Sequence, residues 1–490
     1  MTRKRRRRPL HFLTIAFVTA FCVGVIGAIL TDTPQFPEQP QTPRTQTRVE
    51  PYNQTDVPEQ VRPPSRIAEG ESLPEATPPV PTLPPRNLDP IETPRKLPPQ
   101  KSRTTQRKGI TILQLGDSHT AADFMTGELR RVLQAKYGDG GAGYLIAGRP
   151  HAGVRSSAFR INASDGWSYE ALQRSAENAK FWLSGFNAIA KESGETISFK
   201  SDSPFSFDRI EVQALRQPKG GNIEIRIDGV LQSEVSLDGN VREPVVIQMV
   251  PERAGSDRLR EISVTTKGEG IVNLASIAVY NRQTGISYSS VGFPGATVDI
   301  LNKFDDVIFE NELRRLNPQI VVLAFGTNEG FNDTLELDRY RQSYESALGK
   351  IRRALPGVTI VMMAPPDAAR GPKKQDGDDK NDNSTKKSQT KATKEDGPCG
   401  DWKTPANLNR VRDVQEQIAK RHKLVYWNWA SIMPAECGAD RWANMSPPLV
   451  AKDRVHFTME GYRQTAAQFL KVLLPVIEQV RQSHDAVSNH

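Results

Sequence analysis

The chain has 490 residues, of which 37% are hydrophobic and 25% are charged, so it is long enough for two or three domains rather than one. Its formal net charge is +8, but part of this excess comes from the first eight residues, MTRKRRRR. Neither a zinc-ligand spacing nor an aromatic-basic pattern accompanies the charge, so we expect no nucleic-acid binding.

The N-terminal segment has the pattern of a membrane anchor. Residues 1–9 are dense in Arg and Lys, and residues 10–30, LHFLTIAFVTAFCVGVIGAIL, are apolar over about the length of a bilayer-spanning helix. The basic flank favours a cytoplasmic N-terminus, so we expect a single-pass helix in the inner membrane with the remaining chain in the periplasm. A cleaved signal peptide is the alternative, because it shares the basic head and the apolar stretch. The rest of the chain is exported in either case.

Residues 31–108 are rich in Pro, Gln, Thr and charge, and they hold about half of the chain's 36 prolines. Such a composition does not build a packed core, and it stiffens the backbone toward polyproline II. We therefore expect a disordered stalk between the anchor and the folded domains.

The pattern changes at Gly109, where a first globular segment covers residues 109–153. Residues 110–115, ITILQL, are typical of a buried strand, and residues 120–136 favour a helix. Residues 138–148, GDGGAGYLIAG, are dense in glycine. They lack the lysine of a P-loop and the strand-turn-helix placement of a dinucleotide site, so we interpret them as a tight structural loop.

Residues 154–285 have a period of two and predict an inserted β-sandwich. Alternation is clear in NIEIRID at residues 222–228, and two Asp-Gly pairs nearby are turn signals. Many short strands at regular spacing are typical of a sandwich. Further strands are expected at residues 209–215, 243–249, 260–266 and 274–280.

The α/β pattern resumes over residues 286–490. This alternation of strands and helices indicates a parallel sheet with helices on both faces. Residues 370–398 have no apolar periodicity and predict a disordered surface loop. The expected strands are residues 319–325, 358–364 and 424–429, and the expected helices are residues 337–355, 407–422 and 459–482.

Cys399 and Cys437 are the only cysteines outside the apolar N-terminal stretch. The sequence around them lacks the further ligands that a zinc site needs. An oxidising compartment allows the two thiols to pair. We therefore expect a disulfide between them that fixes the root of the 370–398 loop.

Three polar motifs come at or near the carboxyl ends of predicted strands, where a parallel sheet places its functional residues. They are the Gly-Asp-Ser-His stretch around Ser118, the Gly-Thr-Asn-Glu stretch around Asn328, and the pair formed by Asp453 and His456. A serine hydroxyl needs a base to become a nucleophile, and the imidazole base needs a carboxylate to fix its tautomer. The motifs therefore predict a triad of Ser118, His456 and Asp453.

An acyl-transfer reaction also needs hydrogen-bond donors for an oxyanion. The backbone N–H of Ser118, the side chain of Asn328 and the N–H of a glycine would suffice. Residues 289–301, SSVGFPGATVDIL, are interpreted as a loop between the insert and a following helix. Gly295 is the candidate there because no side chain shields its N–H, and Gly292 is the alternative.

Each motif also has an ordinary structural interpretation. Gly-Asp-Ser is a common turn, Asn328 is a residue type that caps helices, and Asp453 with His456 is compatible with a surface pair. Their occurrence together, each at a strand-to-helix junction, favours a catalytic site. His119 is a competing base, but it adjoins Ser118 and is expected to point elsewhere. Asp117 is expected to hold the turn.

With these motifs the chain resembles the SGNH, or GDSL-type, hydrolases. The resemblance covers about residues 109–153 and 286–490, and it implies a flavodoxin-like parallel sheet. The matching stretches are GDSH for the serine block, GFPGAT for the glycine block, GTNE for the asparagine block and DRVH for the Asp-x-x-His block. By this resemblance Ser118 is the nucleophile, Asp453 and His456 complete the triad, and Ser118, Gly295 and Asn328 supply the oxyanion donors. The chain departs from the pattern at Glu329, where many members have Asp, and in the glycine block, which is not a close match.

A narrower resemblance links this chain to exported peptidoglycan O-acetylesterases. It is carried by GDSHTAADFMTGELRRVLQAKYGDGGAGYL, by the β-rich insert and by GTNEGF. In that family the insert resembles a carbohydrate-binding β-sandwich, and the enzyme removes 6-O-acetyl groups from N-acetylmuramic acid. The resemblance implies a serine esterase that acts on an O-acetylated cell-wall polysaccharide without a metal or an organic cofactor. The stalk and the 370–398 loop lie outside it.

Two other functions share these sequence features. An O-acetyltransferase uses the same residues but passes the acetyl group to a sugar hydroxyl of peptidoglycan or of an exopolysaccharide. A non-catalytic glycan-binding protein uses the sandwich alone, and the intact triad motifs speak against it.

Overall fold

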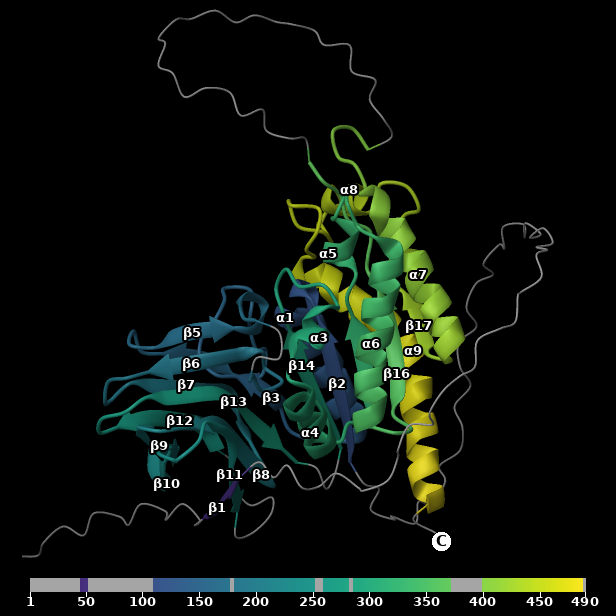
Figure 1. Ribbon diagram of the computed structural model, residues 1–490. Coiled ribbons are helices and arrows are strands. Elements are labelled where there is room, and N and C mark those ends of the chain that lie inside the picture. The colour runs from purple at the N-terminus through teal and green to yellow at the C-terminus, as the bar shows by residue number, and fades with distance from the viewer. Residues whose placement is uncertain are drawn as a thin grey trace, which may run out of the picture. The chain divides into compact units, whose positions relative to one another are not determined.

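The computed structural model describes residues 45–51, 109–176, 180–251, 259–281, 285–371 and 399–487 (Figure 1). The predicted basic N-terminus and membrane helix lie outside these residues, and so does the predicted stalk apart from one strand. Nearly all of the predicted loop at residues 370–398 also lies outside them. Within the described ranges, no helix combines the length and the apolar character that crossing a bilayer requires.

A parallel sheet forms the centre of the α/β part. Its strand order is β14-β2-β15-β16-β17, and every neighbouring pair is parallel. All residues of β2 and β15 are buried, as expected of strands that are covered on both faces. The strands are β14 (Ile286–Gly292), β2 (Ile110–Gly116), β15 (Ile320–Ala324), β16 (Thr359–Ala364) and β17 (Val425–Asn428).

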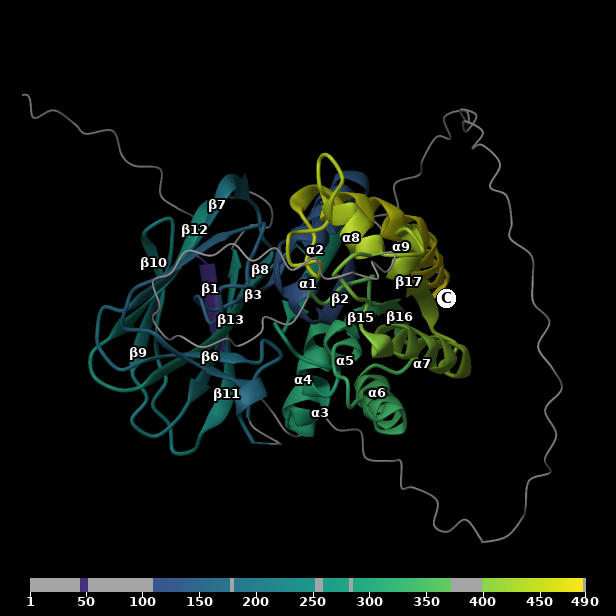
Figure 2. The same ribbon diagram turned by 90° about the horizontal axis from the view of Figure 1, so that it is seen from above.

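Helices cover both faces of this sheet, as Figure 2 shows. Alternate residues of β2 point to opposite sides, so that Ile110 and Ile112 join one apolar core while Leu113 and Leu115 join another. This is the architecture that the alternation of strands and helices predicts. The first core is closed by α2 (Phe124–Tyr137) and α9 (Met459–Val487), and the second by α3 (Ile300–Lys303), α4 (Asp306–Leu316), α6 (Leu337–Ala354) and α7 (Ala406–His422).

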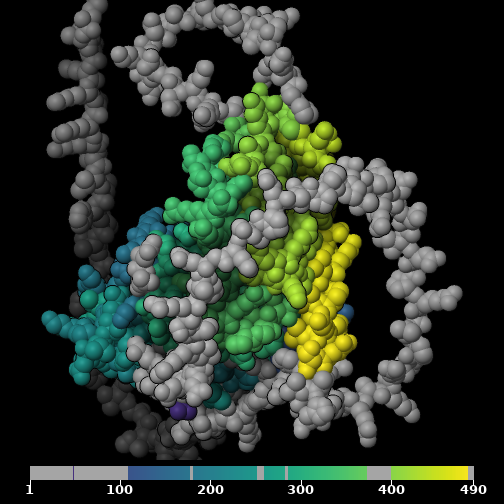
Figure 3. Space-filling model, turned by 45° about the vertical axis from the view of Figure 1, so that its right-hand side comes forward, coloured from purple at the N-terminus to yellow at the C-terminus, as the bar shows by residue number. Residues whose placement is uncertain are grey.

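The edge strand β17 packs one residue against each helical layer. Trp427 lies on Phe469 of α9 with ring centroids 5.0 Å apart, whereas the Tyr426 hydroxyl donates to the carbonyl of Arg412 in α7 at 3.2 Å. On the surface, light green atoms of the part of the chain that contains α7 adjoin the yellow C-terminal helix (Figure 3). Shorter helical turns of this part are α5 (Thr327–Gly330), η2 (Trp429–Ile432) and α8 (Gly438–Ala443).

The inserted segment forms two antiparallel sheets that enclose a core of their own, as residues 154–285 predict. The core consists of inward-facing apolar residues such as Val212, Ile225 and Val264. One sheet has the order β1-β11-β8-β13-β6-β5 with β3 paired to β13, and the other has the order β10-β9-β12-β7-β4. The strands of the first sheet are β1 (Thr45–Pro51), β3 (Gly143–Ile146), β5 (Ser168–Ala171), β6 (Phe186–Ala190), β8 (Arg209–Arg216), β11 (Glu243–Pro251) and β13 (Val272–Tyr280). Those of the second are β4 (Arg160–Ala163), β7 (Thr196–Phe205), β9 (Asn222–Ile227), β10 (Val230–Ser236) and β12 (Leu259–Lys267), and a short turn, η1 (Leu172–Arg174), follows β5.

Three strands lie where the sequence predicts loop or stalk. β1 falls within the predicted disordered stalk and pairs along its length with β11. β3 falls within the glycine-dense stretch and pairs with β13, so residue 153 does not divide the hydrolase segment from the sandwich. β14 includes residues 289–292 of the predicted loop and pairs residue for residue with β2. Proline, glycine and serine weaken the local strand signal, but pairing with a neighbouring strand overrides it.

A buried polar cluster joins the sandwich to the α/β part. The Tyr144 hydroxyl donates to Gln213 Oε1 of β8 at 2.5 Å, and Gln213 Nε2 donates to Glu312 Oε2 of α4 at 3.1 Å. Arg315 of α4 forms ion pairs with Glu312 and with Glu211 of β8. Because these charges are buried and mutually paired, removing one leaves its partner uncompensated. The cluster therefore ties β8 firmly to α4.

Cys399 and Cys437 form a disulfide, with Cα atoms 5.3 Å apart. The bond connects the chain that follows the 370–398 segment to the residue before α8. Close by, Arg370 and Lys403 exchange two backbone hydrogen bonds of 2.8 and 3.0 Å, and Ala369 N donates to the carbonyl of Arg454 at 2.9 Å. The root of the segment is thus attached to the loop between Asp453 and His456.

Candidate active site

Ser118 is the first residue of helix α1 (Ser118–Ala121), and only Asp117 separates it from the end of β2. Asp117 caps this helix, because its Oδ1 accepts a hydrogen bond from His119 N at 3.0 Å. The Asp117 N–H donates to the carbonyl of Ala324 at the end of β15, at 3.2 Å. The turn is therefore held between two neighbouring strands, and the serine lies at the carboxyl edge of the sheet.

The structure brings Ser118, His456 and Asp453 into one hydrogen-bond chain. His456 Nε2 lies 3.0 Å from Ser118 Oγ, across 338 positions of sequence, and His456 Nδ1 lies 2.7 Å from Asp453 Oδ2. Asp453 Oδ1 also accepts hydrogen bonds from the N–H groups of Val455 and His456, each at 3.0 Å. Arg454 takes a left-handed φ of 56° between them. These contacts fold the Asp-x-x-His loop so that His456 bridges the carboxylate and the serine.

The electrostatics of this loop suit a general base. Partial burial opposes ionisation of Asp453, but hydrogen bonds from His456 and Val455 outweigh it and lower the pKa of the carboxyl. The hydrogen bond to Asp453 raises the pKa of His456 above its ordinary value of 6.5. An ionised carboxylate at Nδ1 makes Nε2 more basic toward the serine proton.

The asparagine and glycine motifs touch each other beside the serine turn. Asn328, in α5, donates through Nδ2 to the carbonyl of Ala296 at 2.8 Å. Gly295 is exposed and has a φ of +77°, and a Cβ there meets nothing within 4 Å. Gly292 is buried against α1, where a Cβ lies 2.1 Å from the N atom of Ala121. Tight packing against α1 thus explains why residue 292 is a glycine. The backbone of Gly295 is instead open to a ligand. The role of Gly295 as an oxyanion donor stays a prediction.

His119 points away from Ser118 into an aromatic core. Its Nδ1 lies 2.9 Å from the hydroxyl of Tyr462, and the rings of Trp429 and Phe457 pack edge-on against it. Burial lowers the pKa of His119 to about 3. A neutral imidazole with this packing is a core residue rather than a second base.

Two buried carboxyl groups lie close to the triad and were not among the predicted catalytic residues. Asp117 is 2% exposed and Glu329 is 1% exposed. Burial raises the pKa of Asp117 to about 6 and that of Glu329 to about 7, and the charge of Asp117 adds to the rise at Glu329. Asp117 belongs to the motif of Ser118 and Glu329 to the motif of Asn328, so both residues lie in stretches that the sequence analysis singles out. Only the fold shows that both are buried and that they interact.

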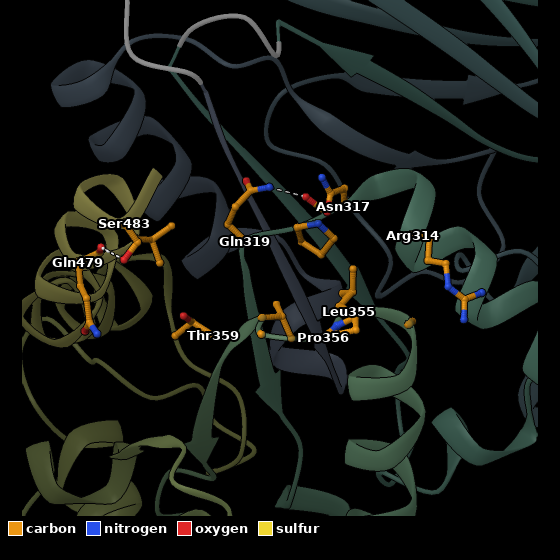
Figure 4. A pocket seen from close by; sticks show the side chains of 13 residues that line it. Arg314, Asn317, Gln319, Leu355, Pro356, Thr359, Gln479 and Ser483 are labelled. Carbon is orange, nitrogen blue, oxygen red and sulfur yellow. Dashed lines mark hydrogen bonds between the residues drawn. The ribbon is translucent and has the colours of Figure 1, made fainter. Parts of the chain in front are cut away.

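A groove of about 650 Å³ lies at the opposite end of the sheet (Figure 4). Gln319 and Thr359, at the amino ends of β15 and β16, line it together with Gln479 and Ser483 of α9. Gln319 Nε2 donates to the carbonyl of Asn317 at 2.6 Å beside it. The residues that line the groove include neither the triad nor the oxyanion candidates. It is therefore separate from the catalytic edge.

The described part of the chain contains no group of three or more His, Cys, Asp and Glu side chains that could hold a metal ion. The parts that it does contain are a serine nucleophile, a histidine base, a carboxylate that orients the base, and candidate donors for an oxyanion. These are the parts that acyl transfer through a serine requires.

Comparison with known proteins agrees with this geometry. Residues 274–464 match the model of the GDSL-like Lipase/Acylhydrolase family, a range that holds Asn328, Asp453 and His456 while Ser118 precedes the insert. Among solved structures, one of a peptidoglycan O-acetylesterase is 26% identical with a TM-score of 0.59, over 76% of this chain and 92% of its own.

A structure of a family two carbohydrate esterase from Clostridium thermocellum is 10% identical with a TM-score of 0.27, over 64% of this chain and 99% of its own. A search of curated proteins found no match. The family match over residues 274–464, the structural likeness over 76% of the chain and the Ser-His-Asp geometry together support an SGNH hydrolase that resembles peptidoglycan O-acetylesterases.

Proposed function

We propose that the protein is a serine esterase that removes O-acetyl groups from a cell-wall glycan, with peptidoglycan as the substrate. The observation that carries the proposal is the hydrogen-bond chain from Ser118 through His456 to Asp453 at the carboxyl edge of the sheet. The likeness to a peptidoglycan O-acetylesterase over 76% of the chain supports the glycan as substrate class.

In the first half of the reaction, Ser118 Oγ attacks the carbonyl carbon of the acetyl ester. His456 Nε2, 3.0 Å away, takes the hydroxyl proton as the new C–O bond forms. The carbonyl π electrons move onto the oxygen and give a tetrahedral oxyanion. When the bond to the sugar oxygen breaks, His456 returns the proton to that oxygen. The free sugar hydroxyl leaves, and the acetyl group stays on Ser118.

The oxyanion is held by preorganised donors, namely the N–H groups of Ser118 and Gly295 and the amide of Asn328. Each such donor contributes a few kcal/mol, roughly 3, because it is aimed at charge that develops only in the transition state. In the second half, His456 takes a proton from water, and the water oxygen attacks the acetyl carbon. The second oxyanion collapses, Ser118 Oγ recovers its proton from His456, and acetic acid leaves and ionises in solution to acetate.

We also propose that residues 10–30 anchor the enzyme in the inner membrane and that its catalytic domain faces the periplasm. The basic residues before this apolar stretch support that orientation, and the Cys399–Cys437 disulfide fits an oxidising compartment. Fractionation of cells that express the full chain tests the anchor. Recovery of the protein in the soluble periplasmic fraction contradicts it and indicates a cleaved signal peptide.

The function is tested by incubating the full-length protein with O-acetylated peptidoglycan and measuring released acetate. Ser118→Ala serves as the matched control, because it removes one oxygen atom and keeps the fold. We expect acetate from the wild type only, and equal acetate release from both proteins contradicts the serine mechanism. If the protein hydrolyses a small acetyl ester but releases no acetate from peptidoglycan, the result supports the esterase activity and contradicts peptidoglycan as the substrate. Acetyl groups that appear on an added glycan, in place of free acetate, indicate an acetyltransferase.

A further inference from the structure

The loop at residues 293–299, which carries Gly295, follows β14 and is held from one side by two consecutive residues of α5. Asn328 Nδ2 donates to the carbonyl of Ala296 at 2.8 Å. Glu329 Oε1 accepts from the N–H of Val298 at 2.8 Å. A donor side chain thus meets a backbone acceptor, and an acceptor side chain meets a backbone donor two residues further along the loop.

Glu329 is a buried acid that accepts a hydrogen bond from this loop through Oε1, and the backbone of Gly326 also hydrogen-bonds to its carboxyl group. It is 1% exposed, and a buried carboxyl group costs free energy unless its surroundings compensate for it. Alternate residues after the glycine are also oriented inward, since Ala296 and Val298 are 5% and 1% exposed. The hydrogen bonds from α5 therefore hold the loop on its buried side. Gly295, on the other side of the loop, is exposed and has a φ of +77°.

We propose that Glu329 is a positioning residue, which holds the Val298 N–H and thereby fixes the loop that presents the Gly295 N–H to the oxyanion. This inference rests on the proposed esterase function. Glu329 does not touch the substrate. It acts through the loop, so its loss displaces one oxyanion donor without removing the nucleophile, the base or the groups that bind sugar.

The length of the side chain gives the proposal a structural reason. Asn328 and Glu329 are neighbours in a helix of a single turn, yet both reach the same loop. The shorter amide reaches Ala296, and the longer carboxyl reaches Val298 at an equal distance of 2.8 Å. An Asp at position 329 is one methylene shorter, so it cannot reach Val298 unless the backbone moves.

A pair of neutral variants of similar size tests the proposal. Glu329→Gln keeps an oxygen that accepts from Val298, and Glu329→Met fills the same space without any acceptor. Because the substitution to Met removes a buried acid rather than apolar packing, we expect Glu329→Met to fold. Circular dichroism and the unfolding temperature of each full-length variant check this before kinetics.

The kinetic readout is hydrolysis of a soluble acetyl ester. We expect Glu329→Met to lower kcat by roughly 30-fold with KM within about twofold of the wild type, because one oxyanion donor loses its alignment. We expect Glu329→Gln to stay within about threefold of the wild type. An equal loss in both variants overturns the proposal, since it traces the effect to the negative charge. Full activity in both also overturns it. Absence of esterase activity in the wild type is the separate result that overturns the proposed function.

Discussion

The two ends of the parallel sheet differ in what they offer a ligand. The carboxyl end gathers Ser118, Asn328 and the Asp453–His456 loop. The amino end has a groove of about 650 Å³ lined by prolines, amides and hydroxyls, with no paired nucleophile and base. The direction of the strands, rather than the volume of a groove, thus determines where the catalytic residues lie.

Helix direction gives a physical reason for this difference. α4 and α6 end beside the groove, and the residues that follow them, Asn317 and Leu355, line it. Helix ends present carbonyl oxygens and a partial negative charge, whereas helix starts present N–H groups and a partial positive charge. The carboxyl edge has helix starts, including that of α9 soon after His456. An oxyanion is favoured at that edge and disfavoured at the groove.

The largest effect on activity is expected from Ser118→Ala, which removes the nucleophile. Hydrolysis of an acetyl ester should fall by at least about 10³-fold, because the rest of the triad has nothing to activate. The measurement is the initial rate of acetate release, with circular dichroism as a check on folding. A decrease of less than tenfold means that another residue at this edge is the nucleophile.

Asp453→Asn should change both the rate and its dependence on pH. In the wild type, kcat/KM falls as the pH drops through the pKa of His456, which lies above 6.5, because a protonated imidazole cannot accept the serine proton. Without the carboxylate that pKa falls, so the acid limb moves to lower pH. The maximal rate decreases by roughly 10²-fold or more, because the imidazole tautomer is no longer fixed.

The pH profile of kcat/KM for the two proteins checks this expectation. Asp117, with its pKa raised by burial to about 6, and Glu329, with its pKa raised by burial to about 7, titrate in the same range. Asp453 forms its hydrogen bonds with Val455 and His456 instead. Loss of positive charge on His456 can only raise the pKa of Asp117, so an acid limb that belongs to either buried acid does not move to lower pH. An unmoved acid limb in Asp453→Asn therefore assigns that limb to Asp117 or Glu329.

Asn328→Ala should lower kcat by roughly 10²-fold, which is the usual effect of removing one oxyanion donor. The Asn328 amide also holds Ala296, so the neighbouring Gly295 donor is disturbed as well. Steady-state kinetics should show the loss in kcat rather than in KM. A loss confined to KM means that Asn328 binds the substrate in its ground state and does not stabilise the oxyanion.

The smallest effect on activity is expected at the amino end. Gln319 Oε1 accepts from the Thr111 N–H at 2.8 Å, at the start of β2. Gln319→Ala leaves that buried N–H without its partner and should lower the free energy of unfolding by about 1–2 kcal/mol. The rate of ester hydrolysis at 25 °C should stay within about twofold. A large loss of activity without a loss of stability means that the groove takes part in the reaction.

The two ends also differ in how well the sequence predicts them. The serine motif can be recognised because it follows a strand, and the Asp-x-x-His motif because its two groups precede the last helix at a spacing of three. The structure brings Ser118 Oγ and His456 Nε2 to 3.0 Å from each other. The roles of Asp117 and Glu329 cannot be read from the sequence, since burial depends on contacts between motifs about 200 positions apart. The choice between Gly292 and Gly295 likewise depends on which one packs against Ala121.

Strand pairing was the less predictable part of the fold. β14 contains serines at alternate positions, such as Ser287 and Ser289, that are buried nonetheless, so its sequence does not show the continuous apolar run of a buried strand. β3 begins at Gly143, whose φ of +74° is typical of a turn. Such strands form because a neighbour supplies the ladder hydrogen bonds, and one sequence read alone does not reveal that neighbour.

The pairing of β1 with β11 has a consequence for how the protein is produced. A recombinant form that begins at residue 108 lacks Thr45–Pro51, and β11, with Val246 and Ile247 in its middle, becomes the outermost strand. An open strand edge with apolar residues invites edge-to-edge association between molecules. Shortening the chain to remove the proline-rich region is thus expected to lower solubility, and a start before Thr45 should preserve a monodisperse sample.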